Sequence, residues 1–364
     1  MDQIAIPCIA MRGGTSKGLF FHAKDLPATT ALRDRVLLAA MGSPDPRQID
    51  GLGGGHPLRS KVAIIGPPSR IDADVDYLFL QVAVDEAYVR DTQNCGNMLA
   101  GVGPFAIEQG MVAALDGTTP VRVHMLNSGT MAVAHVMTPG GVVTYTGDTH
   151  IDGVPGTGAA IVLDFLDVAG SSCNSLLPTG NAMDHEQGFA VTCIDNGMPV
   201  VLLRAADFKK TGRESPEALE ADTALKQQLE SIRLALGPRM HLGDVAAATV
   251  PKMCLVAPPT RGGTISTQTF IPHRVHQSIG VLGAASVAAA CAVEGSIAQE
   301  CAGTVPIAGA HRYDIEHPTG FLTAEINIDI DEAGVHIRRS ALIRTARKLM
   351  QGDVFVSASA WSDS

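Results

Sequence analysis

The sequence predicts an α+β protein of two pseudo-symmetric lobes, each a curved, mostly antiparallel sheet wrapped round a central apolar helix. Three observations predict this architecture. Strand-like segments dominate the 364 residues, two stretches of small apolar residues are typical of buried helices, and one strand-to-helix pattern occurs twice. Because 46% of residues are hydrophobic but only 4% are aromatic, we expect cores built mainly from aliphatic side chains.

The strand-like segments are rich in β-branched or alternating apolar residues and form two series along the chain. The first series lies at 61–65, 76–84, 121–126, 131–137, 142–146 and 159–165, and the second at 189–194, 199–203, 252–256, 264–271 and 321–328. Gly140-Gly141, between two strands of the first series, predicts a hairpin turn.

Three helices are expected. One starts at Ser215-Pro216, where a capping residue precedes a proline, and its apolar residues recur at helical spacing until Gly237-Pro238 stops it. The other two, at about 95–110 and 278–295, are apolar on all sides, which indicates burial.

An internal repeat organises these elements. The segment KVAIIGPP (61–68) matches KMCLVAPP (252–259), and each is followed by a strand region and then by one of the two apolar helices. In this alignment Ser278 occupies the place of Cys95. We therefore expect a first lobe at 1–185, joined by the last strand or helix at about 340–364, and a second lobe at 186–339.

Charge and motifs exclude several function classes. The formal net charge of −10 argues against a nucleic-acid partner, and we expect the basic cluster within 338–348 to be a solvated face. No signal peptide is recognised, and the uncharged run 275–293 falls short of the roughly 20 residues of a membrane span. No metal site is expected, because the sequence has no H-E-x-x-H motif, no C-x-x-C pair and no EF-hand loop. No nucleotide cofactor is expected, because GGTSKG (13–18) has the wrong order for a P-loop. Seven cysteines without a C-x-x-C pair predict reduced thiols in the cytoplasm.

Cys95 and Lys61 are the candidates for proton transfer. At a helix N-terminus, free backbone N–H groups and the helix dipole would favour the Cys95 thiolate and could also bind a carboxylate. Lys61 opens an apolar strand beside Ser60, where desolvation disfavours the ammonium form and favours a neutral general base. The alternatives are a structural cysteine and a lysine that reaches solvent.

Further polar residues are candidates for binding an anion. Arg12, Thr15, Ser16 and Lys17 form a glycine-flanked loop suited to this role, or an ordinary turn. Ser278 could bind a carboxylate or simply cap its helix. Lys252, the equivalent of Lys61 in the second repeat, could likewise be desolvated at its strand or reach solvent.

Four segments together carry a resemblance to a known family: MRGGTSKG (11–18), SKVAII (60–65), QNCGN (93–97) and EHPTG (316–320). Over essentially its whole length the chain resembles the methylaconitate isomerase family, which has the diaminopimelate epimerase-like fold. The resemblance implies a cleft between two lobes and an acid–base pair formed by Lys61 and Cys95. Epimerases of this fold use a second cysteine, which Ser278 replaces here, so two-cysteine racemisation is not expected.

The resemblance also implies the reaction. GSPDPRQIDGLGG (42–54) and LGPRMHLGD (236–244) are most similar to the branch that interconverts the keto and enol forms of 4-oxalomesaconate in gallate degradation, without a cofactor. The substrate would be a small tricarboxylate. Its carboxylates and developing oxyanion are expected to contact Arg12, Thr15, Ser16, Lys17, Ser60, Gly96, Asn97, Lys252, Arg274, Ser278, Ile279 and Gly280.

Two other functions remain open. An allylic or cis–trans isomerase of methylaconitate-type or methylitaconate-type acids would need the same Lys61 and Cys95 pair. A non-catalytic accessory protein would bind a tricarboxylate without exchanging protons at carbon. Low aromatic and charge content is compatible with a subunit interface, and a homodimer is expected.

Overall fold

The computed structural model describes residues 2–92, 94–166, 168–271, 273–331 and 334–361. The chain divides into two compact units. The first unit comprises residues 1–163 and 344–364, and the second comprises residues 164–343. The chain passes between them within strand β8 (Ile161–Leu166) and near the end of strand β16 (Gly334–Arg344).

The first unit is a mixed, mostly antiparallel sheet with helices on it. Its elements are β1 (Gln3–Gly13), β2 (Ser16–His22), η1 (Ala23–Asp25), α1 (Thr30–Met41), β3 (Lys61–Gly66), β4 (Val75–Val82), β5 (Val89–Arg90), α2 (Gly96–Glu108), β6 (Gly117–Met125), β7 (Thr130–Thr138), η2 (Pro139–Gly141), β17 (Ala346–Ser357) and α7 (Ala358–Trp361). Pairing is antiparallel for β17–β1, β1–β2, β3–β4 and β6–β7, and parallel for β2–β3 and β4–β6.

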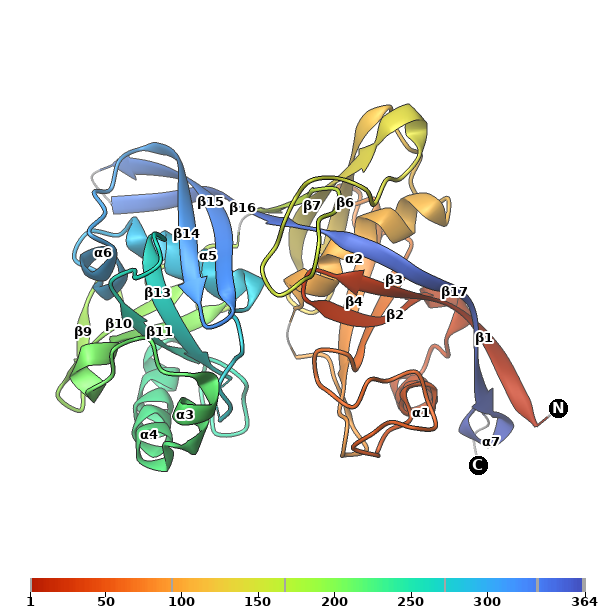
Figure 1. The fold of residues 1–364 in the computed structure, drawn as a ribbon, viewed down its shortest axis with the longest axis horizontal. Coiled ribbons are helices and arrows are strands. Elements are labelled where there is room, and N and C mark those ends of the chain that lie inside the picture. The colour runs from red at the N-terminus through yellow and green to blue at the C-terminus, as the bar shows by residue number, and fades with distance from the viewer. Residues whose placement is uncertain (1, 93, 167, 272, 332–333, 362–364) are drawn as a thin grey trace. The chain divides into compact units, whose positions relative to one another are not determined.

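Strand alternation assigns each side chain of this sheet to one of two helices. Val62 and Ile64 of β3 belong to the core that α1 covers. On the opposite face lies α2, where Phe20 of β2 packs on Phe105, with ring centroids 6.1 Å apart. Figure 1 shows α2 running beside β3 and β4. Lys61 shares its side of β3 with Ala63, so its side chain starts on the α2 face.

The second unit has the same kinds of layer. Its elements are β9 (Asp184–Glu186), β10 (Phe189–Asp195), β11 (Pro199–Arg204), η3 (Ala205–Phe208), α3 (Pro216–Ala221), α4 (Thr223–Arg239), β12 (Lys252–Ala257), β13 (Ile265–Phe270), α5 (Val281–Cys291), α6 (Ile297–Ala302), β14 (Gly309–His317) and β15 (Gly320–Asp331), followed by β16. Pairing is antiparallel for β10–β11, β12–β13, β14–β15 and β15–β16, and parallel for β11–β12 and β13–β14.

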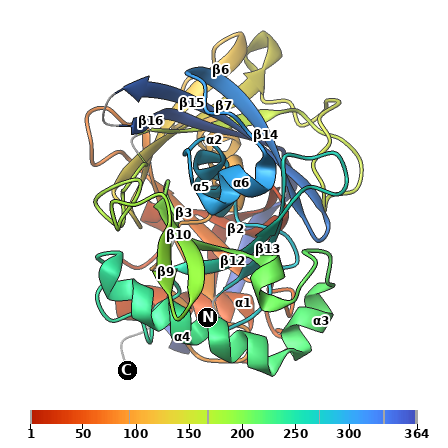
Figure 2. The same cartoon turned by 90° about the vertical axis from the view of Figure 1, so that its left-hand side faces the viewer.

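This order of pairings repeats that of the first unit, from β11 to β15 as from β2 to β7. Met253 and Leu255 of β12 pack in the core under α4, while α5 contacts β10, β11, β14 and β15. Figure 2 shows α4 and α5 on opposite sides of β12. Each unit is therefore a curved sheet with one central apolar helix, and α5 is buried along its whole length.

The observed units differ from the predicted ranges. The first unit ends at Leu163, earlier than the expected boundary near 185. Residues after it belong to the second unit because the carboxylate of Asp195 accepts hydrogen bonds from the backbone N–H groups of Ser172 (2.7 Å) and Cys173 (2.9 Å). The C-terminal segment that joins the first unit begins at Arg344, close to the expected start at about 340, and its strand β17 pairs with β1.

Two local predictions were wrong. Residues 142–146 are not a strand, because after Gly140 and Gly141, with φ of 65° and 74°, the chain leaves the sheet in an irregular loop. The helix expected from 215 is two helices, α3 and α4, because the Asp222 side chain accepts a hydrogen bond from Leu225 N and caps a new helix. Pro238 lies inside the last turn of α4, which ends at Arg239.

Candidate active site

Lys61 is the first residue of β3 and is only 7% exposed. It pairs with Gly18 of β2 on one side and with Gln81 of β4 on the other. Its Nζ donates a 2.7 Å hydrogen bond to Oε1 of Gln81 and lies 5.0 Å from the centroid of the Phe79 ring. The lysine is therefore buried against neutral partners rather than paired with a carboxylate in these contacts.

Cys95 is the N-cap of α2, so the predicted helix begins where the sequence placed it. Its side chain makes no capping hydrogen bond, and its carbonyl accepts one from Leu99 N (3.0 Å) and one from the hydroxyl of Tyr77 (3.3 Å). Burial, followed by the nearby Cys95 thiol, raises the pKa of Tyr77 well above its usual value, so Tyr77 stays protonated as a donor. The N–H groups of the first turn of a helix, here including that of buried Gly96, have no partner within the helix.

The turn between β1 and β2 is fastened to the start of α2. Asn97 Nδ2 donates to Thr15 Oγ1 (3.1 Å), and Thr15 N donates to Asn97 Oδ1 (3.4 Å). Two glycines allow this approach, because a Cβ on Gly13 would lie 2.3 Å from Asn97 O and one on Gly14 would lie 2.0 Å from Asn97 Oδ1. The structure thus brings the predicted residues Thr15, Cys95, Gly96 and Asn97 together.

The other polar residues of this loop differ in their surroundings. Ser16 is 2% exposed, and its Oγ has no hydrogen-bond partner among the described residues. The Arg12 guanidinium donates to the carbonyls of Gly14 (2.8 Å) and Thr345 (3.0 Å), and burial together with Arg347 lowers its pKa. Lys17 is exposed on β2. Arg12 therefore holds the turn, while the Ser16 hydroxyl is available to donate a hydrogen bond.

Ser60 and Lys252 are both buried, and their side-chain polar atoms form hydrogen bonds within the protein. Ser60 Oγ accepts a 2.7 Å hydrogen bond from Gln48, which fixes the loop before β3. Lys252 opens β12 as Lys61 opens β3, and it is likewise 7% exposed. Its Nζ donates to the Thr249 carbonyl (2.6 Å). The repeat therefore places two buried lysines at equivalent strand starts but gives them different partners.

Ser278 does not occupy the place of Cys95 in the second unit. The N-cap of α5 is Gly280, and the buried Ile279 separates it from Ser278. Ser278 lies before the helix because its N–H donates to His276 Nδ1 (2.9 Å) and its Oγ is 3.2 Å from His317 Nε2. Arg274 is exposed on the loop that precedes them.

The segment EHPTG also contains a fully buried carboxylate. Glu316 accepts hydrogen bonds from the backbone N–H groups of Thr260 (3.0 Å), Arg261 (2.7 Å) and Gly263 (3.0 Å). Although burial disfavours its charged form, these donors outweigh that cost and hold the pKa of Glu316 below its usual value. Glu316 therefore fixes the loop opposite β14, next to His317.

Sequence reasoning missed Gln81, Tyr77 and His317. Tyr77 and Gln81 alternate with Phe79 along β4, so the three side chains share one face, and that alternation was a signal within 76–84. Their partners could not be identified without the register of β3 against β4. His317 is buried and its Nδ1 lies 3.2 Å from Thr319 Oγ1.

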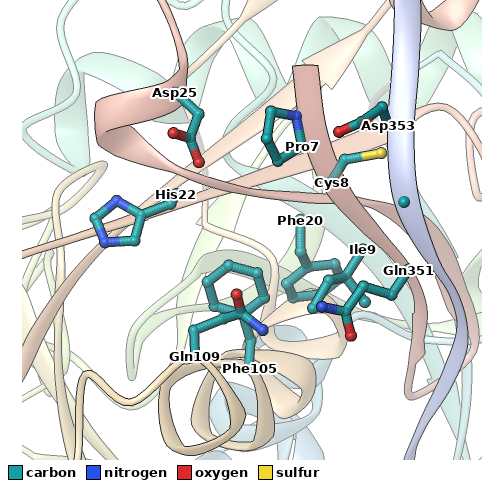
Figure 3. A pocket seen from close by; sticks show the side chains of 11 residues that line it. Pro7, Cys8, Ile9, Phe20, His22, Asp25, Phe105, Gln109, Gln351 and Asp353 are labelled. Atoms are coloured by element: carbon teal, nitrogen blue, oxygen red, sulfur yellow. The ribbon is translucent and has the colours of Figure 1, made fainter. Parts of the chain in front are cut away.

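A pocket of about 190 Å³ lies elsewhere in the first unit (Figure 3). Its lining includes Cys8, the rings of Phe20 and Phe105, and the carboxylates of Asp25 and Asp353. Burial raises the pKa of Cys8 to about 11, so this thiol is not a ready nucleophile. None of the predicted site residues lines this pocket.

The arrangement in the first unit suits general acid–base chemistry. Comparisons with known proteins give the family. Residues 3–357 match the family described as PrpF protein. The chain belongs to the PrpF family. It is 60% identical over 361 residues to the 4-oxalomesaconate tautomerase of Pseudomonas putida, with 99% of each chain covered. It is 58% identical to the (4E)-oxalomesaconate Delta-isomerase of Novosphingobium sp., with 96% of this chain and 97% of the relative covered.

Solved structures agree with the PrpF assignment. The crystal structure of methylitaconate-delta-isomerase matches with a TM-score of 0.83 and 36% identity, covering 100% of this chain and 98% of that one. A hydroxyproline epimerase from Agrobacterium vitis matches with a TM-score of 0.58 and 13% identity, covering 97% and 93%, which shows the fold alone. These matches confirm the predicted epimerase-like fold, and the PrpF relatives confirm that the chain is an isomerase.

Among the described residues, no cluster of three or more His, Cys, Asp or Glu side chains could hold a metal ion. All seven cysteines are free thiols. Over the same described part of the chain, no helix is long and apolar enough to cross a membrane.

Proposed function

We propose that this PrpF-family isomerase interconverts the keto and enol forms of 4-oxalomesaconate, with Lys61 and Cys95 as its acid–base pair. The observation that carries the proposal is local. Lys61 is buried on the α2 face of the first sheet, and Cys95 caps the helix that covers that face. Identity of 58–60% to two proteins named for oxalomesaconate chemistry supports the choice of substrate.

The substrate's own chemistry defines the task. In keto 4-oxalomesaconate a methylene group lies between a ketone and a conjugated alkene, so its C–H bonds are acidic. Neutral Lys61 removes one methylene proton, the electron pair moves onto the ketone oxygen as a dienolate, and the Cys95 thiol protonates that oxygen. One C–H bond and the S–H bond break while one N–H bond and one O–H bond form, which leaves Lys61 as the ammonium and Cys95 as the thiolate. A proton passing from the ammonium to the thiolate through solvent restores both groups, and the reverse reaction uses the same two groups with exchanged roles.

Backbone donors would stabilise the charge that develops on oxygen. The N–H groups of the first turn of α2, at Gly96 and Asn97, are proposed to hold a carboxylate or the oxyanion. Ser16, whose buried Oγ has no partner among the described residues, is proposed to donate to a substrate carboxylate. Ser278 is proposed to bind a carboxylate through its hydroxyl.

Proton NMR of 4-oxalomesaconate in D₂O tests the proposal. We expect rapid keto–enol interconversion and exchange of the methylene protons with the wild-type protein. Lys61→Met and Cys95→Ala should each lower that rate by about 10²- to 10⁴-fold while the protein remains folded. The matched controls Lys24→Met, at an exposed lysine, and Cys301→Ala should keep wild-type rates. Full activity in folded Lys61→Met or Cys95→Ala would refute the assignment.

An allylic isomerase is the second candidate, because the structure of methylitaconate-delta-isomerase matches the whole chain. That reaction returns the proton to carbon instead of oxygen. A methylitaconate-type or 2-methylaconitate control in the same NMR series distinguishes the two, since double-bond migration there with inert 4-oxalomesaconate would favour the allylic reaction. Binding of both acids without exchange would favour a non-catalytic accessory protein.

We also propose a cytoplasmic homodimer, supported by the free thiols and the low aromatic content. Light scattering coupled to size exclusion tests the assembly. A mass of about 38 kDa, that of one 37.9 kDa chain, would refute the dimer.

A further inference from the structure

We propose that Gln81 is a positioning residue that sets the protonation behaviour of Lys61, an inference that rests on the proposed role of Lys61. Gln81 Oε1 accepts the 2.7 Å hydrogen bond from Lys61 Nζ. The two residues are directly paired across β3 and β4, so the contact is built into the register of the sheet.

The hydrogen bonds of the Gln81 amide nitrogen fix the orientation of the amide group. Nε2 donates to the carbonyls of Ser60 (2.8 Å) and Pro57 (3.1 Å). A flipped amide would point its oxygen at these carbonyls and its N–H groups at the ammonium, so both contacts would be lost. The loop before β3 therefore forces one neutral acceptor to face Lys61.

A neutral acceptor has a chemical consequence that a carboxylate would not have. It orders Nζ, but it stabilises the ammonium form less than a charged partner would. Phe79, at 5.0 Å, adds another uncharged neighbour. The arrangement suits a lysine that must release and regain a proton in each turnover.

The loop before β3 brings basic groups close to Lys61. His56 and Arg59 lie in the preceding loop, where burial of the imidazole, then Arg59 and then Lys61 lower the pKa of His56. From β2 the paired residue is Gly18. None of these is a carboxylate, so a glutamate at position 81 would be a new charge next to the ammonium.

The test is the pH dependence of kcat/KM for 4-oxalomesaconate tautomerisation in the wild type, Gln81→Glu and Gln81→Met. In Gln81→Glu the new carboxylate stabilises the ammonium form of Lys61. The acid limb of the kcat/KM–pH profile should therefore move to higher pH by about one to three units. Gln81→Met removes the acceptor, so the limb should move down while kcat falls by about tenfold and KM changes little. Gln3→Glu, which adds the same charge on the exposed start of β1, should leave the limb in place.

The outcomes separate the inference from the function on which it rests. If kcat/KM falls by the same factor at every pH in both Gln81 variants, and the acid limb of the pH profile does not move, Gln81 only supports the loop. That result would refute the inference. If Gln81→Glu does not fold, the direction of the shift in Gln81→Met still decides. Failure of the wild type to exchange methylene protons, or full activity of Lys61→Met, would instead refute the proposed function.

Discussion

Gly13→Ala probes the close approach between the β1–β2 turn and the start of α2. The new Cβ would lie 2.3 Å from Asn97 O and 3.2 Å from Met98 Cα, and both are backbone atoms that cannot rotate away. Because Cβ atoms do not approach other atoms closer than about 3.0 Å, the turn or the helix must move by about 0.7 Å or more.

That movement should affect both stability and turnover. Overpacking of this kind costs about 1–3 kcal/mol of unfolding free energy. Because Cys95 caps the displaced helix, a shift approaching 1 Å should also lower kcat by about 10²-fold. Urea unfolding gives the first quantity and deuterium exchange at the substrate methylene gives the second.

Gly352→Ala is the matched control for this experiment. It makes the same chemical change in β17 of the same unit, where the new Cβ would lie 3.5 Å from Met350 Sδ, an ordinary contact. We expect its stability to stay within about 0.5 kcal/mol of wild type. Gly13→Ala with wild-type stability and wild-type kcat would show that the turn and the helix are not packed as described.

Three other substitutions have definite expected outcomes. Tyr77→Phe should cost about 0.5–1.5 kcal/mol in urea unfolding, because the Cys95 carbonyl retains its helical hydrogen bond, and a cost near zero would contradict the observed contact. Glu316→Gln should flatten the acid side of the stability–pH curve. Folding lowers the pKa of Glu316, so its ionised carboxylate stabilises the protein at pH values above the usual glutamate pKa of 4.5. This stabilisation is lost as the pH falls through the lowered pKa, and an unchanged stability–pH curve in Glu316→Gln would refute the argument. Ser278→Ala should raise KM by about tenfold with little change in kcat, whereas a selective loss of kcat would argue against carboxylate binding.

Much of the fold was predictable because its signals are local. The apolar, β-branched run after Lys61 predicts β3, and every residue of that strand is buried. The apolar run after Cys95 predicts α2, and the capping position is correct. The repeat of KVAIIGPP as KMCLVAPP led to the two buried lysines at equivalent strand starts.

Where the predictions were wrong, a specific tertiary or capping contact outweighed a local preference. Asp222 ends one helix and caps the next, which hydrophobic spacing alone does not show. Ser278 is held before α5 by His276 and His317, so the cap moves to Gly280. Arg344, expected on a solvated face, is 6% exposed, and burial lowers its pKa to about 10.

The sequence by itself determined the two-unit α+β architecture, the helix that Cys95 caps and the strand that Lys61 opens, because periodicity and capping act over a few residues. Only the tertiary structure decided which groups surround the two candidates for proton transfer. Gln81 accepts a hydrogen bond from Lys61, and Tyr77 donates one to the Cys95 carbonyl. Asn97 donates one to Thr15 in the β1–β2 turn, 82 residues earlier in the chain. These contacts depend on the register of distant strands, which the packing of the whole unit sets.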